Sequence, residues 1–196
     1  MAKVKILVKG YDRDISDGVW YASPTVTLVQ NKGLNIIVDP GINRKLLLKS
    51  LRKEGLKPKD INYVLITHWH VDHFLLMGIF PKAKFLDGGL FYKGDRAIKH
   101  KGIVPGTKLK IVATPGHDVD DCSLLVPTRK GTVAIVGDLF WWSEKEEQNT
   151  SSIGILINHK DRYVKDKKVL RKSRKKILKL ADWIIPGHGE IFESPR

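Results

Sequence analysis

The segment LITHWHVDHFLLMG, residues 65–78, places four polar side chains directly after the apolar run YVLI. These side chains are His68, His70, Asp72 and His73. Imidazoles and carboxylates cost free energy to bury and add little to packing, so their concentration here calls for a role other than packing. The segment therefore predicts a buried strand that ends at a functional site.

The length of 196 residues is enough to bury a substantial core, and we expect one domain over residues 1–196. No apolar run is long enough to cross a membrane, and the N-terminal MAKVKILVKGYD alternates like a strand rather than a signal peptide. We therefore expect a cytoplasmic protein without membrane association. The only cysteine, Cys122, excludes an intramolecular disulfide and a cysteine-rich zinc site, and it is expected in the core.

Strand and helix signals alternate along the chain. Apolar alternation predicts strands within residues 4–10, 24–30, 34–41, 61–66, 83–88, 108–117, 122–128, 132–138 and 183–190. Helical spacing predicts helices over 43–55, 74–80 and 169–181. Asn43 is the expected N-cap of the first helix, and Leu170, Ile177 and Ala181 form the apolar stripe of the last. These elements favour an α/β (α+β) fold in which helices cover mixed sheets.

Three further metal-binding residue types follow predicted strands. His117 follows KIVATPG, Asp138 follows VAIVG, and His188 follows WIIPG. Loops at strand ends build sites on a rigid scaffold, so we expect these side chains to join the first cluster. His100 and His159 lack this context and are expected on the surface.

The spacing within the first cluster suits two metal ions. Neutral imidazole and carboxylate are the usual ligands of zinc, and they also suit manganese or iron. An extended HWH segment sends His68 and His70 to the same side, because side chains alternate along a strand. The turn that follows can bring Asp72 and His73 to a neighbouring point. One short segment can therefore serve two divalent ions.

The strand-end residues complete this arrangement. His117 would complete the first set and His188 the second, while Asp138 has two oxygens and could bridge them. Two ions about 3.5–4 Å apart can hold a hydroxide between them and clamp a displacement reaction. We therefore expect a hydrolase in which a metal-bound hydroxide cleaves an ester, thioester, lactone or phosphodiester. Asp72 and Asp138 are the candidate catalytic residues, because they could orient the hydroxide or pass a proton.

At this point the sequence resembles the metallo-β-lactamase superfamily. The motifs that carry the resemblance are IIVDPG (36–41), THWHVDH (67–73), TPGH (114–117), VGD (136–138) and IIPGHG (184–189). The resemblance implies a four-layer αββα sandwich with a dinuclear site at one edge. It implies one metal on His68, His70 and His117 and a second on Asp72, His73 and His188, with Asp138 bridging. It also implies that Asp39 supports the site without binding metal.

Departures from the family pattern narrow the expected activity. True β-lactamases of the main class carry a cysteine at the position of Asp138 and an arginine at that of His73, so β-lactam hydrolysis is not expected. Segments 114–126 and 173–192 resemble a small stand-alone branch whose animal form is described as a ribonuclease. This likeness makes a dinuclear ribonuclease one alternative. A mononuclear-iron thiol or persulfide dioxygenase, which uses a subset of similar ligands, is another.

The net positive charge of the chain indicates which kinds of partner it could bind. The chain carries a formal charge of +14, and residues 160–179 contain eleven Lys and Arg against two Asp. Such a segment could bind the phosphates of RNA, although a solvated helix face or heat adaptation explains it nearly as well. The expected partner is accordingly a small-molecule substrate or RNA. Four aromatic residues adjoin candidate ligands and are expected either to line the pocket or to pack in the core. They are Trp69, Phe140, Trp141 and Trp142.

Overall fold

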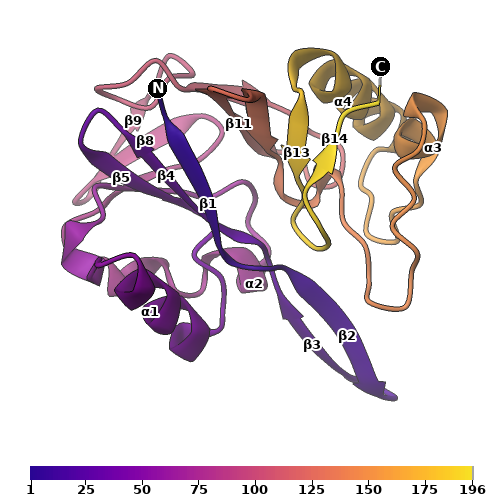
Figure 1. The fold of residues 1–196 in the computed structure, drawn as a ribbon, viewed down its shortest axis with the longest axis horizontal. Helices are drawn as coiled ribbons and strands as arrows, with labels where there is room; N and C mark the ends of the chain where they lie inside the picture. Colours follow the sequence, from indigo (N-terminus) through magenta and orange to yellow (C-terminus); the bar gives the residue numbers. More distant parts are fainter. Residues whose placement is uncertain (196) are drawn as a thin grey trace.

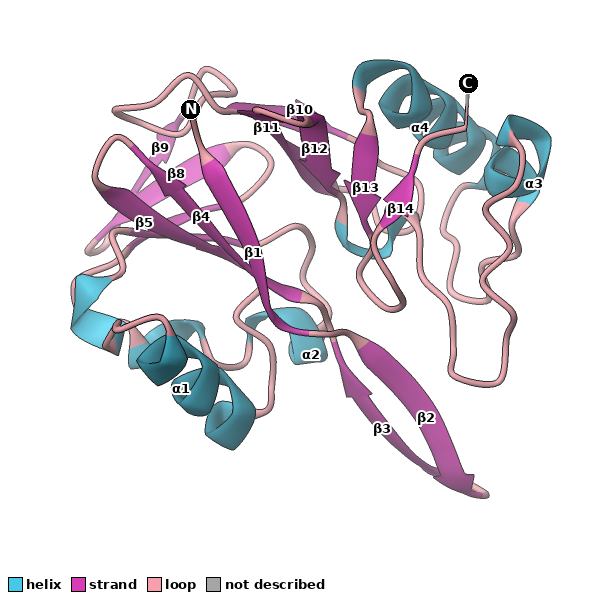
Figure 2. Cartoon of the chain, in the orientation of Figure 1, coloured by secondary structure: helices cyan, strands magenta, loops and turns pink. Residues whose placement is uncertain are grey.

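A computed structural model describes residues 1–195 as two facing β-sheets with helices on their outer sides (Figures 1 and 2). The first sheet has seven strands in the order β1-β4-β5-β6-β7-β8-β9. Their bounds are β1 (Lys3–Val8), β4 (Val26–Asn31), β5 (Leu34–Val38), β6 (Tyr63–Leu65), β7 (Lys84–Leu86), β8 (Leu90–Lys93) and β9 (Arg96–Lys99). Strands β5, β6 and β7 run parallel and the other pairs are antiparallel, so the sheet is mixed.

The second sheet has five strands in the order β10-β11-β12-β13-β14. Their bounds are β10 (Lys110–Ala113), β11 (Cys122–Thr128), β12 (Gly131–Ile135), β13 (Trp183–Ile185) and β14 (Phe192–Glu193). Only β12 and β13 are parallel, because α4 (Lys167–Leu180) lies in the long connection between them. The remaining helices are α1 (Arg44–Lys53), α2 (Val71–Phe74) and α3 (Ile153–Asn158), with short 3₁₀ turns at Pro58–Asp60, Met77–Ile79 and Gly137–Leu139.

Three separate apolar clusters match the three interfaces of a four-layer sandwich. Between the sheets, Ile36 and Val38 of β5 pack with Leu124 and Val126 of β11. Outside the first sheet, Leu47 and Leu51 of α1 pack in a cluster with Val64. Outside the second sheet, a cluster joins α4 to β11, β12 and β13 through Leu170, Ile177, Leu125, Ala134 and Ile184. The αββα fold expected from the family resemblance is therefore confirmed.

The first and last predicted helices form close to where helical spacing places them. The side chain of Asn43 accepts a hydrogen bond from Leu46 N, as expected of an N-cap. Leu170, Ile177 and Ala181 are buried as predicted, and Cys122 lies in the core between the sheets. In the described chain no helix is long and apolar enough to cross a membrane.

The helix predicted over residues 74–80 is wrong in its position. Helix α2 begins at Val71, and the helical hydrogen bond from Leu75 N to Val71 O closes its turn. A separate 3₁₀ turn follows at Met77–Ile79. The apolar run FLLMGIF therefore contributes buried anchors such as Phe80 rather than one continuous helix, and Asp72 and His73 lie on the helical turn itself.

A two-stranded arm projects from the sandwich beside α2 (Figure 1). It consists of β2 (Tyr11–Ser16) and β3 (Val19–Ser23), which pair antiparallel. Along β2, Arg13 forms an ion pair with Glu144, and Asp14 forms one with Lys145. The arm was not predicted, although the Asp17–Gly18 pair is a hairpin-turn signal and Gly18 has a positive φ of 70°.

Candidate metal centre

Strand ends bring all seven candidate ligands to one edge of the two sheets. His68 and His70 follow β6, and α2 then carries Asp72 and His73. The remaining three residues follow strands of the second sheet: His117 after β10, Asp138 after β12 and His188 after β13. The carboxyl ends of β6, β12 and β13 thus supply donors from both sheets to a single point, as predicted from the strand-end pattern.

The donor atoms fall into two groups. In each group, one ligand atom per residue lies within 4.8 Å of every other. The first group holds His68, His70, His117 and Asp138, and the second holds Asp72, His73 and His188. Both groups could hold a metal ion; the six other residues divide between the groups as the resemblance implies, and Asp138 falls in the first group.

Asp138 faces both groups at once. Its Oδ2 lies 3.6 Å from His117 Nε2 and 3.7 Å from His68 Nε2. Its Oδ1 lies 3.3 Å from His73 Nε2 and 3.7 Å from His188 Nε2. The two oxygens of one carboxylate are therefore directed at different donor sets.

Several buried donor atoms fit a metal better than they fit the protein alone. Within the described chain, His68 Nε2, His73 Nε2 and Asp138 Oδ1 make no hydrogen bond. A buried polar atom without a hydrogen bond costs free energy, unless a bound group provides the missing interaction. Nitrogen and oxygen donors that converge in this way suit divalent cations.

The pKa values of the cluster depend on which carboxylates adjoin each ring. Burial lowers the pKa of His68 well below its ordinary value and also lowers that of His70. Burial acts in the same direction at His73, but Asp138 and Asp39 outweigh it and raise the pKa of that ring. At Asp138 burial would raise the pKa, but the neighbouring histidines, His73 foremost, hold it well below its usual range. Metal binding requires neutral rings and ionised carboxylates, so the lowered pKa values of His68, His70 and Asp138 favour it, whereas His73 would release a proton when a metal binds.

Asp39 organises the first part of the cluster. It lies just after β5 with a positive φ of 50°, a conformation that aspartate tolerates better than most residues. Its Oδ1 accepts a hydrogen bond from Thr67 N at 2.8 Å, and its Oδ2 lies 2.7 Å from Thr67 Oγ1 and 2.9 Å from His73 Nδ1. The Thr67 hydroxyl also lies 3.1 Å from His68 Nδ1. Asp39 therefore orients His73 directly and His68 through Thr67, in the supporting position expected for it.

Asp161 plays the equivalent part for His117 and was missed. Its Oδ2 lies 2.8 Å from His117 Nδ1, and its Oδ1 accepts from Tyr163 N. Burial would raise the pKa of Asp161, but the hydrogen bond with His117 outweighs it and lowers that pKa. His188 is held differently, since its Nδ1 lies 3.0 Å from the carbonyl oxygen of Tyr11. Neither support carries a sequence signal: Asp161 lies in a loop within the basic segment, and Tyr11 acts through its backbone.

Two glycines allow the loops to approach closely enough to form the site. A Cβ added to Gly187 would lie 1.8 Å from Asp138 Oδ1, and one added to Gly137 would lie 2.2 Å from Thr67 Oγ1. Real Cβ atoms do not come so close to other heavy atoms, so a side chain at either position would displace Asp138 or Thr67. The glycines of PGH and VGD therefore have a steric role beside the donor residues.

The aromatic residues near the site separate into core and surface. Phe140 and Trp142 are buried in the cluster under α4, and Trp141 is buried against Tyr163 and His188. Of the four aromatic residues that adjoin candidate ligands, Trp69 alone is exposed. His100 and His159 lie outside the donor groups, as expected, but both are half-buried and hydrogen-bonded to backbone carbonyls rather than free on the surface.

Comparison with known proteins agrees with this geometry. A family model described as metallo-beta-lactamase superfamily matches residues 22–106. The chain is also 36% identical to metallo-beta-lactamase domain-containing protein 1 of Xenopus laevis, over 96% of this chain and 80% of that protein. The chain belongs to the metallo-beta-lactamase superfamily. Superfamily membership and the His/Asp cluster together identify a metallo-hydrolase-type protein with a divalent-metal site.

Solved structures of the superfamily share the fold at low sequence identity. A Thermotoga maritima protein assigned only provisionally to the metallo-beta-lactamases superposes with a TM-score of 0.73 and 21% identity, over 98% of this chain and 99% of that one. AidC, a dizinc quorum-quenching lactonase, superposes with a TM-score of 0.58 and 18% identity, over 87% of this chain and 73% of that one. At such identities the likeness establishes the shared sandwich and not a shared substrate.

Proposed function

We propose that the chain is a dinuclear metal-dependent hydrolase of esters, thioesters, lactones or phosphodiesters. Its two ions would be zinc, with manganese or iron as alternatives. The observation that carries the proposal is the position of Asp138, whose Oδ2 and Oδ1 face the first and second donor groups respectively. Two ions that share one carboxylate ligand need such a position.

The carboxylates of the chain suit proton transfer in this reaction. Two ions bound here would lower the pKa of a water molecule toward neutrality and polarise the bond to be cleaved. Asp72 Oδ2 lies 3.3 Å from His188 Nε2. Burial would raise the pKa of Asp72, but its hydrogen bond with His188 outweighs it and lowers that pKa. Asp72 therefore stays ionised and able to accept a hydrogen bond or a proton at the mouth of the site. Asp138, whose two oxygens face the two donor groups, would orient the reacting water as a shared ligand.

A cavity of about 640 Å³ beside Asp72 offers a place for the substrate. Trp20 and Tyr21 of the arm form one wall, and Arg44 at the start of α1 also borders the cavity. This volume is ordinary for a small-molecule pocket, and the aromatic residues would contact an apolar group of the substrate. Arg44 makes no ion pair within the described residues, so its charge is available to an anionic substituent. The cavity therefore favours a small ester, thioester or lactone with an apolar part.

RNA is the second candidate substrate, favoured by the basic segment that borders the site. Lys165 N donates to the carbonyl oxygens of Gly116 and His117, so this end of the basic segment lies beside the first donor group. The exposed lysines of α4 continue from there. A phosphate backbone bound along this segment would pass the cluster, and its affinity would fall steeply with salt concentration.

Turnover assays on the metal-loaded protein test the proposal. The substrates are a nitrophenyl ester, an acyl thioester, an acyl lactone, a bis-nitrophenyl phosphodiester and single-stranded RNA, each with zinc and with manganese. We expect hydrolysis of at least one class that disappears in His188→Ala. Absence of hydrolysis in every class, together with oxygen consumption on a persulfide by the iron-loaded protein, would contradict it.

A pair of variants in the arm tests the substrate cavity. Trp20 borders the cavity, whereas Ile15 is similarly exposed on the same arm and does not. Trp20→Ala should raise KM for an apolar substrate by about tenfold with little change in kcat, because it removes binding shared by the ground and transition states. Ile15→Ala should leave both unchanged. Equal effects of the two substitutions would place the substrate elsewhere.

A further inference from the structure

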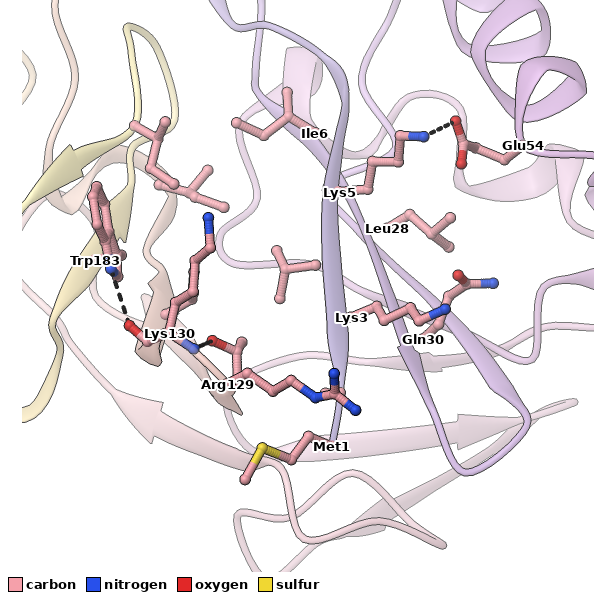
Figure 3. Close-up of a pocket in the computed structure, with 16 residues that line it drawn as sticks. Met1, Lys3, Lys5, Ile6, Leu28, Gln30, Glu54, Arg129, Lys130 and Trp183 are labelled. Carbon is pink, nitrogen blue, oxygen red and sulfur yellow. Dashed lines mark hydrogen bonds and ion pairs between the residues drawn. The ribbon is translucent and has the colours of Figure 1, made fainter.

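A second cavity lies alongside β1, away from the metal centre (Figure 3). Its volume is about 1070 Å³, and none of the seven cluster residues lines it. One wall is β1, and the other is formed by the β11–β12 turn together with β12 and β13. We call this cavity the β1 groove.

The backbone of β1 is unpaired on the side opposite β4. Strand β1 is the edge of the seven-stranded sheet and pairs only with β4. Within the described chain, no backbone hydrogen bond beyond this pairing involves residues 3–8. A free strand edge offers N–H and C=O groups to another extended segment, which can add to the sheet as a further strand.

The side chains of β1 alternate between two chemistries. Val4 and Ile6 are partly buried and pack against the core between the sheets. Lys3 and Lys5 project from the opposite face, toward α1, as Figure 3 shows beside Ile6. Lys5 pairs with Glu54 at 2.6 Å. A segment added to β1 would therefore meet apolar side chains on one face and lysines on the other.

The far wall of the groove repeats the combination of apolar and basic groups. Trp183 of β13 donates its indole N–H to the Lys130 carbonyl oxygen at 3.2 Å, which fixes the ring beside the turn (Figure 3). Arg129 and Lys130 in that turn are exposed. With Lys3, they make no ion pair within the described residues, and the one acidic lining residue, Glu54, is already paired. The β1 groove thus has uncompensated positive charge at its rim.

This charge selects among the possible occupants. A second copy of β1 paired antiparallel would bring Lys3 and Lys5 beside the same lysines of that copy, and like charges across strands are destabilising. A nucleic acid would satisfy the charge but has no backbone that can continue the hydrogen-bond ladder of a strand edge. An extended peptide with acidic residues meets both requirements.

The geometry points to the β1 groove as a docking site for an extended acidic peptide of a partner protein, which adds to β1 as a strand. The peptide alternates acidic with aliphatic residues, so that an acidic residue lies over Lys3, which makes no ion pair within the described residues, and aliphatic residues lie against Val4 and Ile6. A further acidic side chain of the peptide, or the carboxylate at the peptide's own C-terminus, would reach Arg129 and Lys130.

Fluorescence anisotropy with a labelled peptide of alternating glutamate and valine tests this site on the full-length protein. Two control peptides are used. One has the same composition with its glutamates clustered, which removes the alternation. The other keeps the side chains but is N-methylated at alternate backbone nitrogens, which removes the donors for strand pairing. We expect saturable binding of the alternating peptide and weaker binding of both controls by about tenfold or more. Amide NMR signals of residues 3–8 should shift on binding.

Matched charge variants separate this site from general attraction to a basic protein. Lys3→Glu with Lys130→Glu should weaken binding by about tenfold or more, because both lysines face the peptide. Lys93→Glu with Lys172→Glu makes the same change of net charge at exposed positions outside the groove and should change affinity less than about twofold. Circular dichroism of both variants checks folding.

Three results would overturn the proposal: no saturable binding, equal binding of the N-methylated peptide, or equal loss in the two charge variants. Self-association that sedimentation detects and that Lys3→Glu alters would identify a second copy as the occupant instead, which also overturns it. Binding of single-stranded RNA in preference to the peptide at this groove would do the same.

Discussion

The two sheets support the ligands that they bring to the metal centre through different kinds of structure. On one side, Asp39 lies at the end of a buried strand and holds both the backbone and the hydroxyl of Thr67 as well as His73. On the other side, Asp161 lies in a loop between α3 and α4 and holds His117 and one backbone N–H. The first support is integral to the fold, whereas the second serves mainly to orient one ligand. The two sides should therefore respond differently to mutation.

Loss of Asp138 should affect the ligands of both sheets at once, because this carboxylate faces both donor groups. Asp138→Ala is expected to lower hydrolytic activity by at least about a thousandfold, since both proposed ions lose a ligand. The measurement is kcat/KM on whichever substrate the panel identifies. Asp118→Ala is the matched control, because Asp118 Oδ2 lies 3.8 Å from His70 Nε2 yet belongs to neither donor group. A similar loss in both variants would contradict the special position of Asp138.

Loss of Asp39 should damage the fold as well as the site. Asp39→Ala leaves the buried Thr67 N–H and hydroxyl without their acceptor, which we expect to cost about 2–4 kcal/mol in the free energy of unfolding. Urea denaturation in the presence of a chelator measures this cost without any contribution from bound metal. Asp39→Asn keeps one acceptor oxygen and should lose less. An unchanged unfolding free energy in Asp39→Ala would remove the structural role assigned to this side.

Loss of Asp161 should affect metal binding more than folding. Asp161→Ala frees the Nδ1 of His117, and we expect metal affinity to fall by about 10–100-fold. The unfolding free energy in chelator should fall by about 1–2 kcal/mol, less than in Asp39→Ala, because Tyr163 with its N–H lies at the surface and only the buried His117 Nδ1 is left without its partner. Competition with a chromophoric chelator measures the affinity. If Asp161→Ala destabilised the chelated protein as much as Asp39→Ala, the contrast between the two supports would be wrong.

The smallest expected effects come from the N-caps of α1 and α4, the helices that cover the outer faces of the two sheets. Asp166 caps α4 by accepting from Lys168 N and Val169 N, whereas Asn43 caps α1 by accepting from Leu46 N alone. Each change to alanine should cost about 1 kcal/mol, with the larger loss at Asp166 because its charge also favours the helix N-terminus. Thermal unfolding of the single and double variants measures both costs, which should add because the helices lie on opposite faces. Strong non-additivity would mean that the two outer layers are coupled.

The features best predicted from the sequence are those where a metal-binding residue type directly follows an apolar strand. Apolar strands that run into His68, His117, Asp138 and His188 predicted both the core and the point where the donors meet. The pattern works because strand ends on one edge of a sandwich converge whatever the details of the loops. Asp39 was found through its family motif rather than through any periodicity.

Features set by tertiary contact were missed. Asp161 carries no local signal, since its role exists only once the loop before α4 reaches His117. The helical turn at Val71 was placed too late because the apolar run after His73 outweighed the weaker signal of a single turn. The arm formed by β2 and β3 was overlooked because its outer residues Val19, Trp20 and Tyr21 are exposed and give no inside–outside alternation.

Metal content per chain tests the central claim most directly. The protein is purified without a chelator or histidine tag and measured by plasma mass spectrometry beside His188→Ala and Asp138→Ala. We predict two equivalents of a divalent metal, zinc or manganese, that fall to one or fewer in His188→Ala and fall further in Asp138→Ala. One equivalent of iron that His188→Ala leaves unchanged would contradict the dinuclear centre and indicate oxygen-dependent thiol chemistry instead.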